Sequence, residues 1–154
     1  MLHNLEEIIT IERWFQKTYP RINKKIPSFV KKELKNYKDI TSLQFSVVIF
    51  VFSVFVSALI LLSLITQHYY LFLGVSLFYA LNIFTHPLQS LYLRCYTPGV
   101  LTSLILIIPY YSLFFYCYYN TNMFTISSIL GAMTVMVFLV PVFLLSHKIS
   151  EKWK

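Results

Sequence analysis

Long uninterrupted apolar runs fill most of the chain from residue 43 onward. The first, from Leu43 to Ile65, has 23 residues and no charge. A helix of that length rises about 34 Å, which is enough to cross the hydrocarbon core of a bilayer. Further runs follow after short connections, which favour antiparallel neighbours. The pattern predicts four transmembrane helices, over residues 43–65, 69–93, 98–119 and 123–145.

The first residues of the chain follow a helical period of a different kind. Over residues 2–15, one face carries His3, Glu6, Glu7 and Thr10, whereas the aliphatic side chains turn elsewhere. This spacing predicts an amphipathic helix with a polar stripe that combines an imidazole and two carboxylates.

Composition places the chain among membrane proteins. Of its 154 residues, 57% are hydrophobic and only 12% are charged, which is too apolar for an ordinary soluble domain. We therefore expect an all-α, polytopic membrane protein that forms a single domain over residues 1–154. Its parts are the amphipathic helix, a basic interfacial segment over residues 16–41, a bundle of four transmembrane helices and a tail over residues 146–154.

Basic residues are distributed unevenly along this chain. Nine of the thirteen lysines and arginines fall between Arg13 and Lys38, and three more follow the last apolar run. The connections at residues 66–68 and 120–122, which would lie on the opposite side of the membrane, hold none. Because basic loops stay in the cytoplasm, we expect both termini to be cytoplasmic in the cell membrane. An even number of spans agrees with this, and it puts Arg94 in the only other cytoplasmic loop.

The basic stretch from Arg13 to Lys38 also predicts a partner. Each lysine or arginine near an anionic bilayer surface contributes about 1 kcal/mol of attraction. The segment should therefore lie on anionic lipid headgroups. Nucleic acid is not expected as a partner, because the tethering of the chain to the bilayer already explains where these charges lie.

The second apolar run contains polar residues that need a partner. Asn82 and His86 are spaced i, i+4, Gln89 follows three residues later, and Arg94 lies near the cytoplasmic end. Ionisable side chains within a membrane are costly and usually face a bundle interior. The predicted topology puts the N-terminal helix on the same cytoplasmic side as the end of this run, so Glu6 or Glu7 could reach His86 or Arg94.

Three short motifs resemble those of a known family. HNLEE at residues 3–7, NIFTH at 82–86 and RCYTPG at 94–99 are similar to the motifs of the HXXEE family of small integral membrane proteins. The resemblance runs from His3 through the fourth apolar run. It implies a multi-span helical build, and it implies no particular activity because the family has none established.

The same residues suggest a metal centre at the cytoplasmic membrane boundary. His3 and Glu7, one helical turn apart, could bind a divalent cation, zinc or iron, with His86 as the third ligand. Glu6 would orient or deprotonate a bound water, and Arg94 would hold an anionic group of a lipid-like substrate. Thr10, Asn82 and Gln89 are expected to form hydrogen bonds with these metal ligands.

Two other classes of function stay open at this point. In the first, Glu6 and Glu7 neutralise Arg94 and His86 in a structural or partner-binding network without catalysis. In the second, the protein is a small transporter whose polar side chains handle protons or an anion. Prolines within the third and fourth runs would then bend the helices.

Overall fold

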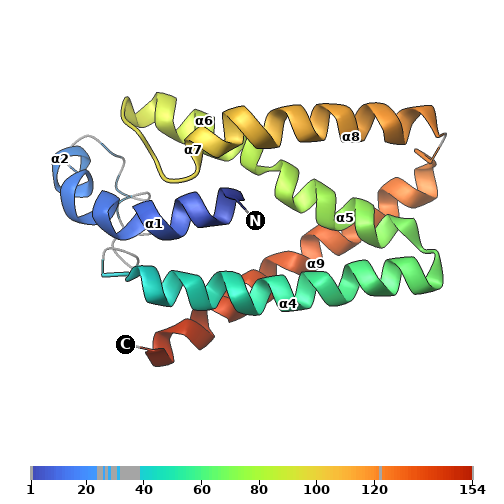
Figure 1. Cartoon of the computed structure of the whole chain (residues 1–154), viewed down its shortest axis with the longest axis horizontal. Coiled ribbons are helices and arrows are strands. Elements are labelled where there is room, and N and C mark those ends of the chain that lie inside the picture. Colours follow the sequence, from blue (N-terminus) through green and yellow to red (C-terminus); the bar gives the residue numbers. More distant parts are fainter. Residues whose placement is uncertain are drawn as a thin grey trace.

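The computed structural model describes residues 2–23, 26, 28, 31, 39–121 and 123–153 (Figure 1). This described part is helical and contains no strand. Its principal elements are α1 (Leu2–Lys17), α2 (Tyr19–Ile22), α4 (Ser42–Thr66), α5 (Tyr69–Ala80), α6 (Asn82–Leu93), α7 (Val100–Thr102), a π-helical turn η1 (Ser103–Ile107), α8 (Ile108–Asn120), α9 (Ile126–Ser150) and a 3-10 turn η2 (Glu151–Trp153).

Four stretches of these helices are long and apolar enough to cross a membrane. They cover Ser42–Thr66, Tyr69–Leu93, Val100–Asn120 and Ile126–Ser150. The prediction of an all-α fold with four spans is therefore confirmed, and the chain is a multi-pass membrane protein. Many large apolar side chains on the spans are exposed, as expected where lipid surrounds them.

The ends of the last two spans differ from the predicted ones. The third span begins at Val100 rather than at residue 98, because Gly99 has a positive φ of 82° and cannot continue a right-handed helix. The fourth begins at Ile126 rather than at residue 123, because the Thr125 hydroxyl caps it by accepting a hydrogen bond from the Ser128 amide. This helix also continues to Ser150, five residues past the predicted end at 145.

The second span is divided into two helices, α5 and α6. The break is at Leu81, and Pro87 lies six residues later inside α6, where it has no amide to donate to the carbonyl of Ile83. Such a missing bond is a common cause of a bend. In Figure 1, α5 crosses the molecule diagonally, and α6 continues in another direction along the upper edge of the view, on the same side as α7. The bend carries the lower half of the span, with His86, toward the N-terminal helix.

Helices α4, α5 and α9 pack together as the core of the bundle. Phe52, Val75 and Leu139, one from each helix, are buried against one another. At Gly74, a Cβ atom would lie only 2.6 Å from Cβ of Val135. A side chain there would therefore separate α5 from α9.

Helix α1 lies between α4 and the α6–α7 region, with its N-terminal end directed toward the interior of the molecule (Figure 1). It is antiparallel to α4: the amide of Ser42, at the start of α4, donates to Glu12 at 3.0 Å. Near the other edge of α1, the Trp14 indole donates to the carbonyl of Tyr96 at 2.6 Å. The predicted basic interfacial segment over residues 16–41 lies largely outside the described residues.

Candidate metal centre

Three predicted ligands meet where α1 passes α6. His3 and Glu7 come from consecutive turns of α1, and His86 comes from α6. Oε1 of Glu7 lies 3.3 Å from Nε2 of His86 and 3.8 Å from Nε2 of His3. One ligand atom from each residue lies within 4.8 Å of the other two. We call His3, Glu7 and His86 the triad.

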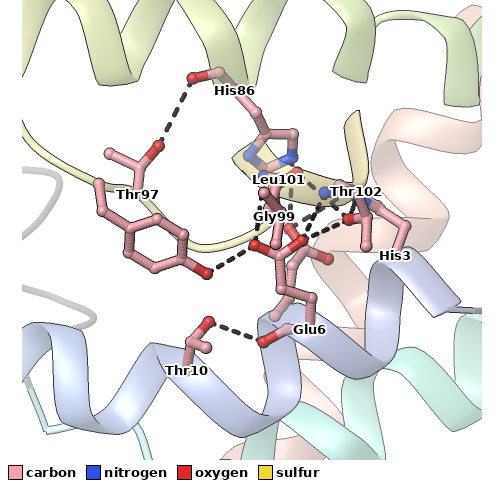
Figure 2. Close-up of polar contacts among 10 residues, drawn as sticks. His3, Glu6, Thr10, His86, Thr97, Gly99, Leu101 and Thr102 are labelled. Atoms are coloured by element: carbon pink, nitrogen blue, oxygen red, sulfur yellow. Dashed lines mark hydrogen bonds and ion pairs between the residues drawn. The ribbon is translucent and has the colours of Figure 1, made fainter. Parts of the chain in front are cut away.

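Gly99 lies beside His3 and His86 (Figure 2). A Cβ atom at this position would lie 2.7 Å from Cε1 of His3, 3.0 Å from Cε1 of His86 and 3.1 Å from Cγ of Glu7. The residue also has a φ of 82°, which L side chains rarely adopt. Both the conformation and the available space therefore require glycine beside the triad.

The hydrogen bonds of His3 determine which ring nitrogen is free. Its Nδ1 lies 2.8 Å from the Thr102 hydroxyl, and this hydroxyl donates its one proton to Glu6 Oε2 at 2.5 Å. The hydroxyl oxygen can therefore only accept from His3, which places the imidazole proton on Nδ1. Nε2 of His3 then carries no proton and has a free lone pair, and it is buried without a hydrogen-bond partner among the described residues. A metal ligand needs such an atom.

Glu6 lies beside the triad, and its hydrogen bonds join α1 to the residues at the start of the third span (Figure 2). Its carboxylate accepts hydrogen bonds from the Tyr96 hydroxyl at 2.6 Å, from the Leu101 amide at 3.3 Å, and from the amide and hydroxyl of Thr102 at 2.8 and 2.5 Å. Burial would raise the pKa of Glu6, but these hydrogen bonds outweigh it and lower the pKa. Glu6 is therefore an ionised carboxylate with both oxygens engaged.

Burial also decides the protonation of the two α1 members of the triad. It lowers the pKa of His3 to about 4, with repulsion from His86 as a further cause. It raises the pKa of Glu7 to about 8, and the negative charge of Glu6 acts in the same direction. At pH 7 the site without a cation thus holds a neutral imidazole and a protonated carboxylic acid. A bound divalent cation would favour the carboxylate form instead.

The remaining predicted site residues lie at different distances from the triad. Thr10 is next to Glu6, donating its hydroxyl to the Glu6 main-chain carbonyl at 2.7 Å. Asn82 is half-buried and Gln89 is exposed, and none of the hydrogen bonds or ion pairs between described residues joins either to the triad.

Arg94 is not part of the cluster either. It is exposed at the C-terminal end of α6, in a left-handed conformation with a φ of 49°. It lines a separate hollow with Pro87 and Leu104. No ion pair within the described ranges connects it to Glu6 or Glu7. Its role in holding an anionic group stays a prediction.

Sequence reasoning missed three contributors to this site, namely Tyr96, Gly99 and Thr102. Tyr96 and Gly99 belong to the RCYTPG motif at residues 94–99. The motif singled out this loop in the sequence, but it did not indicate that these two residues contact Glu6 and the triad. Thr102 follows three residues after the motif. In the structure it lies between Glu6 and His3 and contacts both.

A family model supplies the comparison with known proteins. The model described as a protein of unknown function with HXXEE motif matches residues 1–115, a range that includes the whole triad together with Glu6, Gly99 and Thr102. No curated protein and no solved structure matches the chain. The matched range is most of the chain and includes the motif HNLEE itself. The resemblance seen in the sequence is confirmed over residues 1–115, which end within the third span and do not include the fourth apolar run. The chain belongs to the HXXEE family of proteins of unknown function.

Proposed function

We propose that this protein is a metal-dependent membrane enzyme in which His3, Glu7 and His86 hold one divalent cation. The observation that carries the proposal is the convergence of three ligand atoms within 4.8 Å, from helices far apart in the sequence. The buried and unpaired Nε2 of His3 supports it, since a buried polar atom without a partner is costly.

The distances suit a small transition-metal ion. Metal–ligand bonds of about 2.0–2.2 Å place the ligand atoms of a tetrahedral site roughly 3.3–3.6 Å apart. The Glu7–His86 pair is at 3.3 Å, and the Glu7–His3 pair at 3.8 Å needs only a small contraction. The ligand atoms of the two histidines lie within 4.8 Å of each other, so the imidazoles would also move closer together on binding. Two histidines and one carboxylate are ligands of hydrolytic zinc and of non-haem iron, so these two metals remain the candidates.

The chain's own residues would hold and orient such a cation. Thr102 and Glu6 form a relay that fixes the proton of His3 on Nδ1 and directs Nε2 at the cation. Glu6 would therefore act as a positioning residue, because its oxygens are occupied by hydrogen bonds. A cation with an open position polarises a bound carbonyl or phosphoryl group, or lowers the pKa of a bound water. Since the triad lies among spanning helices, a lipid-like substrate fits best.

We also propose that both termini face the cytoplasm and that residues between Arg13 and Lys38 contact anionic headgroups of the cell membrane. The concentration of basic residues before the first span and after the last supports this orientation. The triad would then open toward the cytoplasmic half of the bilayer.

Metal analysis of the purified protein tests the proposed centre. We expect wild type to retain about one equivalent of zinc or iron per chain, and His3→Ala and His86→Ala to lose it. His68→Ala is a matched control, because His68 is exposed at the connection between α4 and α5. Wild type without metal, or equal loss in the control, would contradict the proposal.

Catalysis is tested separately from binding. The metal-loaded protein is incubated in vesicles of extracted membrane lipids, and the lipids are compared by mass spectrometry before and after. We expect a lipid species to be consumed by wild type and not by the Glu7→Gln variant. If no lipid changes although the protein is fully loaded with metal, the proposed enzymatic activity on these lipids is contradicted. The proposed metal binding would then still stand.

A structural role is the second candidate, and the hydrogen bonds of Glu6 favour it. They join α1 to residues 96–102, so α1 could be held in the bundle without any chemistry. If the network alone matters, Glu6→Gln should destabilise the fold by about 1–3 kcal/mol, and removal of metal should not change the melting temperature. A lower melting temperature after chelation would favour the metal centre.

A further inference from the structure

A cavity of about 910 Å³ adjoins the triad. His3 and Asn4 form its wall on the side of α1, Tyr79 contributes from α5, and the helices α4 and α8 form its other sides. Its volume is at the upper end of the roughly 300–1,000 Å³ typical of ligand sites. Because His3 belongs to both, a molecule in the cavity can have one end at the triad.

The lining of the cavity is suited to hydrocarbon. Most of it is aliphatic or aromatic, and the α4 side carries Ser46, Ser53 and Ser57, whose spacing of seven and four residues puts them on one face. The Ser46 hydroxyl donates to the carbonyl of Ser42 at 2.7 Å, so it offers little polarity to the cavity. The effect of the small serines is to leave space beside α4.

The cavity opens sideways between two spans. Helix α4 packs mainly with α1, α5 and α9, and it makes no extensive contact with α8, both helices being described throughout. Two large side chains that line the cavity, Phe50 of α4 and Tyr110 of α8, are 70% and 55% exposed, which indicates that the cavity opens between these helices. They belong to the spanning stretches 42–66 and 100–120. The opening therefore faces lipid chains rather than water.

The size of the cavity distinguishes between two possible occupants. A spanning helix of a partner is about 10–12 Å wide and 30 Å long, several times the volume of this cavity. A single hydrocarbon chain is narrow enough to enter between α4 and α8. The apolar lining, the lateral opening and the volume together favour the chain.

We propose that the ligand of the triad is a single-chain amphiphile, with its hydrocarbon chain in the cavity between α4 and α8 and its polar head at His3 and Glu7. The inference rests on the proposed function for the role of the head, and on the cavity for the role of the chain. Ser53 and Ser57 then determine how much chain the site accepts, since larger residues there would fill the space.

Photolabelling tests this assignment. The full-length protein in phosphatidylcholine vesicles is labelled with palmitic acid that carries a diazirine in mid-chain, and the labelled peptides are identified by mass spectrometry. We expect labels on residues 46–57 and 107–111, and competition by unmodified palmitic acid. Ser53→Phe and Ser57→Phe should each reduce labelling about tenfold, because filling an apolar pocket costs affinity on that scale.

Ala58→Phe is the matched control, because Ala58 is exposed on α4 and does not line the cavity. Two serine variants are used so that a folding defect in one, detected by melting temperature, leaves the other informative. Absence of labels in the cavity, or equal labelling of the serine and Ala58 variants, would overturn the proposal. Cross-links between two copies of the chain at the same residues would also overturn it, in favour of a helix as occupant.

The metal content of each sample separates the two ideas. A loss of labelling in the serine variants with metal retained supports the cavity as the chain site. Labelled cavity residues in a protein without metal would contradict the proposed function and leave the chain site in place. Full metal content without any label would contradict the chain site alone.

Discussion

Gly99 shows how one missing side chain can leave room for three others. Its hydrogen leaves the space that His3, His86 and Glu7 share, and its φ of 82° lets the chain turn there. The glycine is needed for two separate reasons, conformation and space. They act on different measurable quantities, the stability of the fold and, in the proposed metal centre, the affinity for a cation.

We therefore predict that Gly99→Ala loses the metal and also destabilises the fold. An L side chain in the left-handed region costs roughly 1–2 kcal/mol, and the added Cβ pushes the imidazoles out of the space they occupy. Metal content and thermal unfolding measure the two effects. In the control, Gly131→Ala, the three atoms nearest to the new Cβ all belong to the Tyr70 side chain, which is outside the triad, so metal should be retained. Normal metal content in Gly99→Ala would contradict this view of the site.

The protonation of Glu7 leads to a prediction at the same scale. Its pKa of about 8 means that the carboxyl must lose a proton before it can bind a cation. Metal affinity should therefore rise by up to tenfold per unit between about pH 6 and pH 8 and level off above that. The pKa of His3, about 4, adds nothing in this range. Titrations with metal at several pH values measure the slope, and a slope of zero would contradict an acid that must be deprotonated.

At the scale of elements, the site depends on how α6 and α1 are directed. The amphipathic pattern of residues 2–15 was enough to predict α1 and the face that carries its polar stripe. It could not predict that α1 packs beside α4, because this position depends on contacts of Trp14 and Glu12 with residues distant in the sequence. Likewise, Pro87 is visible in the sequence, but the direction of the bend depends on packing.

We predict that Pro87→Ala weakens metal binding by about tenfold or more while the bundle stays folded. Alanine restores an amide that can donate a hydrogen bond to the carbonyl of Ile83. The straighter helix would carry His86 away from Glu7. Metal affinity and helix content by circular dichroism measure the outcome. Pro141→Ala is the matched control, because Pro141 lies inside α9 and outside the triad. Equal weakening by both substitutions would argue that the bend at Pro87 has no special role.

The contact between α1 and α7 has its own test in Thr102. Thr102→Val keeps the shape of the side chain and removes the hydroxyl that joins Glu6 to His3. Loss of such a hydrogen-bond partner of a ligand typically lowers metal affinity about 10–100-fold. Thr102→Ser should restore most of it, because it keeps the hydroxyl. Metal titration of the three proteins at one pH separates the hydrogen bond from packing. If only packing mattered, Thr102→Val, which keeps the shape of the side chain, would bind metal more tightly than Thr102→Ser.

For the whole molecule, four spans could be predicted from apolar length alone, and the triad could be predicted from helical spacing and the expected topology. The spacing of the HNLEE motif was enough to assign Glu7 to the cation with His3 and His86, and Glu6 to a bound water. What could not be predicted was that the Glu6 carboxylate is occupied by hydrogen bonds from residues 96–102. The fold directs Glu7 at the two histidines and Glu6 at Tyr96 and Thr102, a difference that depends on the loop before the third span.

An even number of spans leads to a prediction about the two sides of the membrane. Gln67 lies between the first two spans, and Lys148 lies near the end of the last one. With both termini in the cytoplasm, a single cysteine at residue 67 should react with a thiol reagent that cannot cross membranes when it is added outside intact cells. A cysteine at Lys148 should react only after the cells are opened. Both variants are made after replacing Cys95 and Cys117 with alanine, and the reverse pattern would place the triad in the outer half of the bilayer.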